Sequence, residues 1–128
     1  MNGEMRMTNA EQGERVFDLE GRCARFGEAV IGFAMRIPVN HVTTPLVHRL
    51  VRAGTSVEAN YCEADGSGSK RDFKFKIGLC RRETRETKHW LRMVVAAESR
   101  LREDARSLWQ EAKELNLNFG AIRRKLGA

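Results

Sequence analysis

The sequence contains two prolines, Pro38 and Pro45, and their confinement to one short stretch constrains the fold more than any other feature. Proline interrupts helices because it lacks an amide donor and its ring clashes with the preceding turn. The rest of the chain is therefore free of the strongest helix breaker. Apolar residues recur there at helical spacing, whereas alternation at period two is absent over any useful length. The sequence predicts an all-α fold.

Four segments carry this helical spacing, and recognisable boundary residues separate them. We expect helices over residues 16–37, 45–64, 70–97 and 101–126. Pro38 ends the first helix, and Thr44 followed by Pro45 predicts the start of the second, with Thr44 as its N-cap. Ser69 is the expected N-cap of the third. Helices of this length with short connections favour an antiparallel, up-down-up-down four-helix bundle.

A chain of 128 residues fits one domain. We assign residues 15–128 to the bundle domain, and we expect the polar residues 1–14 to form a flexible segment. No apolar run reaches transmembrane length. The three cysteines, Cys23, Cys62 and Cys80, include no CxxC pair and indicate free thiols rather than a disulfide framework. We therefore expect a cytoplasmic protein that does not contact a membrane.

Positive charge is concentrated in the second half of the chain. Residues 69–128 carry 16 basic and 8 acidic side chains, whereas residues 1–68 carry 7 basic and 9 acidic ones. Six cations of the third predicted helix fall within about 60° of one another. These residues, the basic stripe, are Lys70, Lys74, Arg81, Arg85, Lys88 and Arg92. Like charges four residues apart repel, and phosphate groups would compensate that repulsion.

We interpret the basic stripe as a surface that binds RNA or DNA through the phosphate backbone. The alternative is that Asp72, Glu103 and other neighbours neutralise it within the bundle or an oligomer. A second alternative is a scaffold or accessory protein whose basic face docks on an acidic protein. At the end of the last helix, Arg123, Arg124 and Lys125 either extend the stripe or simply compensate the helix dipole.

A separate apolar face of the third helix predicts contact between protomers. It consists of Phe75, Leu79, Trp90 and Met93. An exposed apolar patch is a liability for a monomer, so we expect a homo-oligomer with Trp90 as an anchor. The alternative is that this face packs on a second apolar line of the first helix, formed by Phe17, Ala24 and Ile31.

Polar residues of the second helix recur at helical spacing, at Arg52, Ser56 and Asn60, with Glu63 close behind. We expect them to form a buried, hydrogen-bonded network that fixes helix pairing, because buried polar groups must be satisfied. The alternative is a polar binding line.

The sequence predicts no catalytic residue, metal, cofactor or small-molecule substrate. Glu86 and His89 match the Glu-x-x-His spacing of di-iron bundles. Those sites need two such motifs and two further carboxylates, and this chain has one motif. We therefore expect a protein that is not an enzyme.

Three stretches together resemble the four helix bundle protein family. They are Arg52-Ala53-Gly54-Thr55-Ser56-Val57-Glu58-Ala59-Asn60-Tyr61-Cys62-Glu63-Ala64-Asp65, Ser69-Lys70-Arg71-Asp72-Phe73 and Glu86-Thr87-Lys88-His89-Trp90-Leu91-Arg92. That family includes proteins encoded by intervening sequences in bacterial 23S ribosomal RNA genes, and it is related to the accessory variability determinant of diversity-generating retroelements. Tyr61-Cys62 departs from the family pattern and indicates a variant branch. The resemblance implies a homopentamer around a central channel, a basic surface facing nucleic acid, and no catalytic residues.

Overall fold

The computed structural model describes residues 18–127, and the ordered elements in this range are helical. Four α-helices follow one another, with the 3-10 helix η1 (Ser99–Leu101) before the last. They are α2 (Leu19–Ala34), α3 (Thr43–Asp65), α4 (Lys70–Ala97) and α5 (Arg102–Lys125). The predicted all-α, four-helix fold is confirmed. The expected flexible segment, residues 1–14, and the predicted start of the first helix at Val16 lie outside the described residues.

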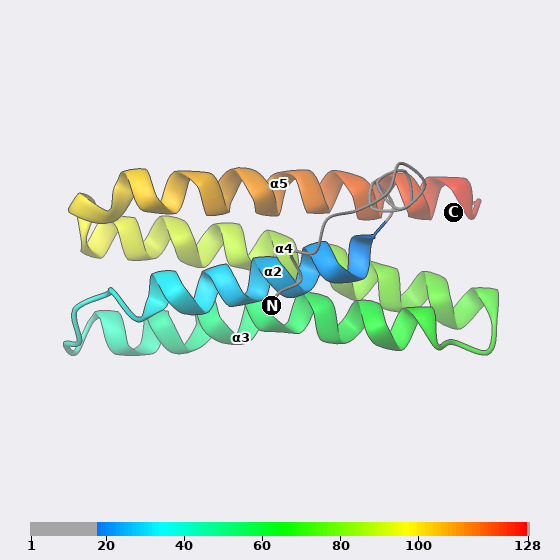
Figure 1. The fold of residues 1–128 in the computed structure, drawn as a ribbon, viewed down its shortest axis with the longest axis horizontal. Coiled ribbons are helices and arrows are strands. Elements are labelled where there is room, and N and C mark those ends of the chain that lie inside the picture. The colour runs from blue at the N-terminus through cyan, green and yellow to red at the C-terminus, as the bar shows by residue number, and fades with distance from the viewer. Residues whose placement is uncertain (1–17, 128) are drawn as a thin grey trace, which may run out of the picture.

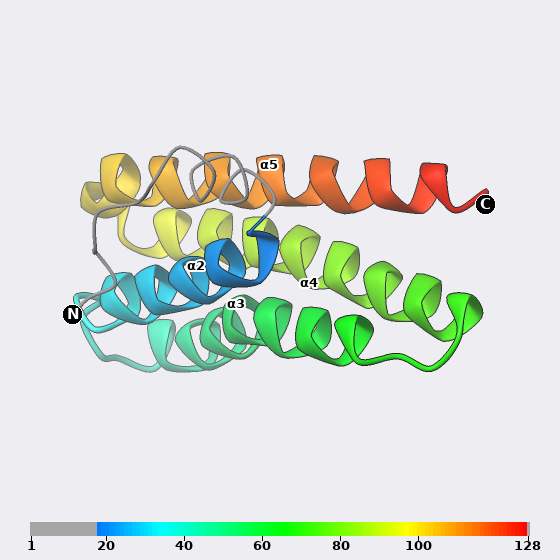
Figure 2. The same ribbon diagram turned by 45° about the vertical axis from the view of Figure 1, so that its right-hand side comes forward.

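The helices lie side by side, and each runs back along the one before it (Figure 1). Contacts join α2 to α3, α3 to α4 and α4 to α5, while α2 and α5 meet over a smaller area. Helix α2 has 16 residues and α4 has 28. At about 1.5 Å per residue, α2 therefore covers only part of the bundle. The start of α4 and the end of α5 extend past it (Figure 2).

The core forms where the predicted apolar faces meet. Its fully buried side chains include Val30, Phe33, Leu50, Val57, Ile77, Leu91, Val94, Leu115 and Phe119. Burying each large apolar side chain contributes about 1.5–3 kcal/mol relative to leaving it in water. No helix within residues 18–127 has the length and apolar character needed to cross a membrane.

Helices α2 and α3 approach closely at two glycines. A Cβ placed on Gly54 would lie 2.9 Å from both methyl carbons of Val30, and one placed on Gly27 would lie 3.4 Å from the carbonyl oxygen of Gly54. Side chains at these positions would push the helices apart. The glycines therefore set the distance between α2 and α3.

The start of α3 differs from the predicted one. Helix α3 begins at Thr43, and Thr44 is not its N-cap. Instead, the side-chain oxygen of Asn40 accepts hydrogen bonds from the backbone amides of Val42 and Thr43, both at 2.9 Å. A side chain four positions upstream of the predicted cap thus satisfies amides that the first turn leaves free. The predicted cap of α4 is confirmed, because the Ser69 hydroxyl accepts from the amide of Asp72 at 3.0 Å.

Candidate nucleic-acid interface

Four of the six cations of the basic stripe lie against α5, namely Lys74, Arg81, Lys88 and Arg92, whereas Arg85 lines a cavity between α3 and α4. Near the start of α4, Lys74 Nζ donates to the carbonyl oxygen of Gly127 at 3.1 Å. Two-thirds of the way along, Lys88 Nζ lies 4.9 Å from the centre of the Trp109 ring. The surface along which α4 and α5 meet on this side is hereafter the α4–α5 seam. It runs nearly the full length of both helices.

The carboxylates of α5 point toward α2 instead. Arg22 of α2 forms ion pairs with Glu111 at 2.7 Å and Glu114 at 3.0 Å. Arg36, just beyond α2, pairs with Asp104 at 2.9 Å. Three of the four acidic side chains of α5 are therefore engaged on the side away from the seam.

Three further carboxylates near α4 are also engaged. Glu103 pairs with Arg106 of its own helix at 3.0 Å. Glu83 and Glu86 of α4 face α3, where Arg52 lies 3.6 Å and 3.1 Å from them. Within residues 18–127, none of the six stripe cations forms an ion pair. Asp72 and Glu103, the neighbours named in the expected alternative, thus make no ion pair with the stripe within these residues.

One end of the seam holds a cavity of about 420 Å³ with an apolar floor and cationic edges. It is lined by Leu91, Arg92, Val95, Ala96, Arg102, Ala105, Arg106 and Trp109. Trp109 is 38% exposed, and Lys88 and Lys113 lie 4.9 Å and 6.0 Å from its ring centre. Cations beside an exposed indole suit a nucleic acid, because bases stack on aromatic rings while phosphates meet the charges.

The α5 half of this surface was not among the residues predicted from the sequence. A usable signal was present, because Arg102, Arg106, Trp109 and Lys113 recur at i, i+4, i+7 and i+11. That spacing places all four on one helix face.

The other end of the seam brings arginines together across two glycines. The guanidinium carbon of Arg123 lies 3.8 Å from the position that a Cβ on Gly78 would occupy. Around the Cβ position of Gly120, Arg124 Nη1 lies at 3.5 Å and Arg81 Nε at 3.7 Å. Of the two uses expected for the basic end of α5, this arrangement favours an extension of the stripe.

A second basic cavity, of about 540 Å³, lies between α3 and α4. Its lining residues are Arg49, Arg52, Arg82, Arg85, Glu86, His89 and Trp90. The Arg49 guanidinium lies 5.5 Å from the Trp90 ring centre, and the His89 ring meets the same indole edge-on at 4.5 Å. Trp90 therefore contacts both Arg49 of α3 and its sequence neighbour His89.

The four residues of the predicted oligomer face lie in two separate parts of α4. Phe75 is 61% exposed, whereas Leu79, Trp90 and Met93 are half-buried. Phe75 and Trp90 are fifteen positions apart, which is about 22 Å along a helix. Arg82, on the same side of α4, separates them. The four residues therefore do not form one continuous patch.

The four side chains of the expected polar network on α3 make separate contacts instead of one network. Ser56 Oγ donates to the carbonyl oxygen of Arg52 at 2.6 Å, and Asn60 Nδ2 donates to that of Ser56 at 2.9 Å. Arg52 reaches Glu86 on α4 at 3.1 Å, and Glu63 accepts from Lys76 at 2.6 Å. These four side chains of α3 do not bond to one another. Backbone oxygens of the same helix satisfy Ser56 and Asn60, and oppositely charged side chains of α4 satisfy Arg52 and Glu63.

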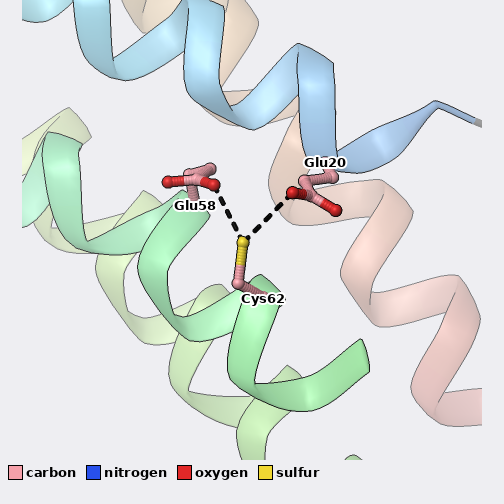
Figure 3. Close-up of side chains that lie close together, drawn as sticks. All are labelled: Glu20, Glu58 and Cys62. Atoms are coloured by element: carbon pink, nitrogen blue, oxygen red, sulfur yellow. Dashed lines mark hydrogen bonds between the residues drawn. The ribbon is translucent and has the colours of Figure 1, made fainter. Parts of the chain in front are cut away.

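Cys62 of α3 lies between two carboxylates (Figure 3). Its Sγ is 2.9 Å from Glu58 Oε2 on the same helix and 3.3 Å from Glu20 Oε2 on α2. These hydrogen bonds raise the pKa of the Cys62 thiol to about 12. A protonated thiol shared between two carboxylates accounts for the geometry. One thiol and two carboxylates also fall short of the four ligands of a structural zinc site.

Residues 22–119 match the sequence model of the 23S rRNA-intervening sequence protein family. A solved structure from Bacteroides thetaiotaomicron, described as a protein with unknown function from the S23 ribosomal protein family, superposes with a TM-score of 0.72. The two sequences are 24% identical, and the match covers 82% of this chain and 97% of that one. At this identity the likeness shows the fold alone. No curated protein matches the sequence.

Proposed function

Since the chain belongs to the 23S rRNA-intervening sequence protein family, we propose that it binds the phosphate backbone of RNA or DNA along the α4–α5 seam, without catalysing a reaction. One observation carries this proposal. The six stripe cations form no ion pair within residues 18–127, while three of the four carboxylates of α5 pair with arginines on the α2 side and Glu103 pairs with Arg106 of its own helix. The seam therefore keeps its positive charge.

This positive charge favours binding to the phosphate backbone of a nucleic acid through counterion release. Each phosphate that a Lys or Arg neutralises releases condensed cations, which makes the affinity fall with salt. If all six stripe residues engage, the slope of log affinity against log salt is roughly −4 for a single strand and roughly −5 for a duplex. The exposed Trp109 ring favours a single strand, because a duplex does not offer its bases for stacking.

The bundle, with its helices antiparallel, is also proposed to be one protomer of a homo-oligomer. The family resemblance implies a pentamer. Exposed apolar side chains support assembly, because Met35, Val39 and Val42 lie together around the α2–α3 connection and Phe75 projects from α4. Multi-angle light scattering tests this part, and a mass of one chain at micromolar concentration would remove it.

The binding test is fluorescence anisotropy with labelled RNA and DNA oligonucleotides over a salt series. We expect micromolar or tighter binding at low salt, with the steep slope given above. Replacing Arg85, Lys88 and Arg92 together by Gln should lower the slope by roughly 2 to 3, because three phosphate contacts are lost. Arg25→Gln is the control, since Arg25 is exposed on α2, away from the seam. Absence of binding at low salt would refute the proposal and leave docking on an acidic protein.

A further inference from the structure

Where α4 and α5 pack together, an arginine of each helix lies against a glycine of the other. Arg123 of α5 lies against Gly78 of α4, and Arg81 of α4 lies against Gly120 of α5. Arg124 joins Arg81 over Gly120. With no side chain at either glycine, the flat guanidinium groups can rest on the opposite helix. Three cations from two helices thus share one small region, the arginine cluster (Arg81, Arg123 and Arg124).

Two donors of this cluster lack partners. The Nε atoms of Arg81 and Arg123 are shielded from solvent and have no hydrogen-bond partner within residues 18–127. The ion pairs of this part of the chain also include none of the three arginines. A buried charged donor without an acceptor is unfavourable, and three adjacent cations add repulsion. An oxyanion between them would relieve both.

Helix pairing at this point does not require the guanidinium groups. Asn116 of α5 donates from Nδ2 to the carbonyl oxygen of Arg81 and to Thr84 Oγ1 on α4, both at 2.9 Å. The buried apolar side chains on either side supply the rest of the contact. The arginine side chains are therefore available for a ligand, and their presence calls for an explanation other than docking of the two helices.

We propose that the arginine cluster binds a phosphoryl group with two negative charges. Arginine presents a planar fork of donors that matches phosphate oxygens, and three such groups suit a dianion better than a single charge. An internal phosphodiester carries one charge, whereas a phosphomonoester carries about 1.5 to 2 near neutral pH. The ligand is a terminal phosphate of a nucleic acid strand, or free phosphate. The first source rests on the proposed function, because the cluster lies at one end of the seam.

The test separates these sources with four probes on the full chain at constant ionic strength. They are inorganic phosphate and one oligonucleotide sequence carrying a 5′-phosphate, a 3′-phosphate or neither. The NMR signals of the arginine Nε–H groups report inorganic phosphate, and anisotropy reports the oligonucleotides. We expect saturable shifts of the Arg81 and Arg123 signals with phosphate. If a strand end is the ligand, one phosphorylated oligonucleotide binds about tenfold or more tightly than the unphosphorylated one.

The decisive variants replace arginine by lysine, which keeps the positive charge but removes the planar fork of guanidinium donors. Arg81→Lys with Arg123→Lys should weaken phosphate binding about tenfold or more. Arg25→Lys, at an exposed position of α2 away from the seam, is the matched control, and circular dichroism confirms that each variant folds. Phosphate binding without oligonucleotide binding would support a free-phosphate site and refute the proposed function. A different result would overturn the proposed phosphate site at the arginine cluster without contradicting the proposed function. That result is oligonucleotide binding with no preference for a terminal phosphate, together with no response to inorganic phosphate.

Discussion

Arg22 of α2 binds Glu111 of α5 at two points, with Nε donating to Oε2 at 2.7 Å and Nη2 donating to Oε1 at 2.9 Å. Nη2 also donates to Glu114 at 3.0 Å. One arginine thus holds two carboxylates of α5 on the side of α2. This contact fixes how α5 is turned about its axis, and its opposite side, which faces α4, keeps the cations. The ion pair is therefore part of what makes the α4–α5 seam basic.

The energy of this ion pair is measurable by a double-mutant cycle of Arg22→Ala and Glu111→Ala. Both side chains are about one-third exposed, which screens the attraction, but the two-point geometry strengthens it. We expect a coupling energy of about 1 kcal/mol from urea unfolding at low salt. The cycle of Glu103→Ala and Arg106→Ala, an exposed pair within one helix, should give less than about 0.5 kcal/mol. Equal couplings for the two pairs would contradict a special role for Arg22.

Gly54→Ala is expected to destabilise the protein. The new Cβ would lie 2.9 Å from the methyl carbons of Val30, whose buried and branched side chain has no other rotamer to adopt cheaply. Overpacking of this kind lowers the free energy of unfolding by about 1–3 kcal/mol. Thermal or urea unfolding checks this. Gly32→Ala is the matched control, because no atom lies within 4 Å of its Cβ position and alanine favours helix by up to about 1 kcal/mol. A stabilising Gly54→Ala would show that α2 and α3 can separate freely.

The start of α3 gives a test between two candidate caps. Asn40→Ala removes the oxygen that accepts from the amides of Val42 and Thr43, so we expect a loss of about 1 kcal/mol in the free energy of unfolding. Thr44→Ala should change it by less than about 0.5 kcal/mol, because Thr44 is exposed and lies inside the first turn. The reverse order would restore Thr44 as the cap.

The helices and the core were predictable because both depend on local spacing. Apolar residues at helical period mark the buried faces of all four helices, and Ser69 caps α4 by a contact only three residues long. The Thr44-Pro45 pattern predicted the wrong N-cap for α3, because proline is tolerated anywhere in the first turn and not only at its first position. Asn40, three positions before the first residue of the helix, binds the free amides of Val42 and Thr43. The residue preferences of the N-cap position do not decide between Asn40 and Thr44.

The surroundings of the basic stripe were not predictable, because they depend on how two helices are turned toward each other. The stripe residues follow from the spacing of α4, but Arg81 lies against Gly120 across 39 positions of the chain. The same holds for Trp109 beside Lys88. The expected polar network around Ser56 and Asn60 failed for a related reason. Their side chains bond back to their own helix, so helical spacing alone did not imply a shared interior.

Cys62 is expected to react slowly with alkylating reagents. Hydrogen bonds from its thiol to Glu58 and Glu20 hold its pKa at about 12, against an ordinary value of 9. At pH 8 about one molecule in ten thousand then carries a thiolate at this position, compared with about one in ten for an ordinary thiol. Glu58→Gln removes the stronger of the two bonds to a carboxylate. Iodoacetamide labelling read by mass spectrometry should be at least about tenfold faster in this variant at pH 8.

The pH dependence follows from the direction of the same shift. A raised thiol pKa favours the neutral form in the folded state, so this contribution to stability is full below about pH 9 and declines as the pH rises toward 12. The decline should be smaller in Glu58→Gln than in the wild type. Glu63→Gln is the control, because Glu63 is exposed on the same helix and pairs with Lys76 instead. Cys23 and Cys80 are buried and should stay unlabelled in all three proteins while these are folded. Equal labelling rates for Cys62 in the wild type and Glu58→Gln would show that the carboxylates do not hold its proton.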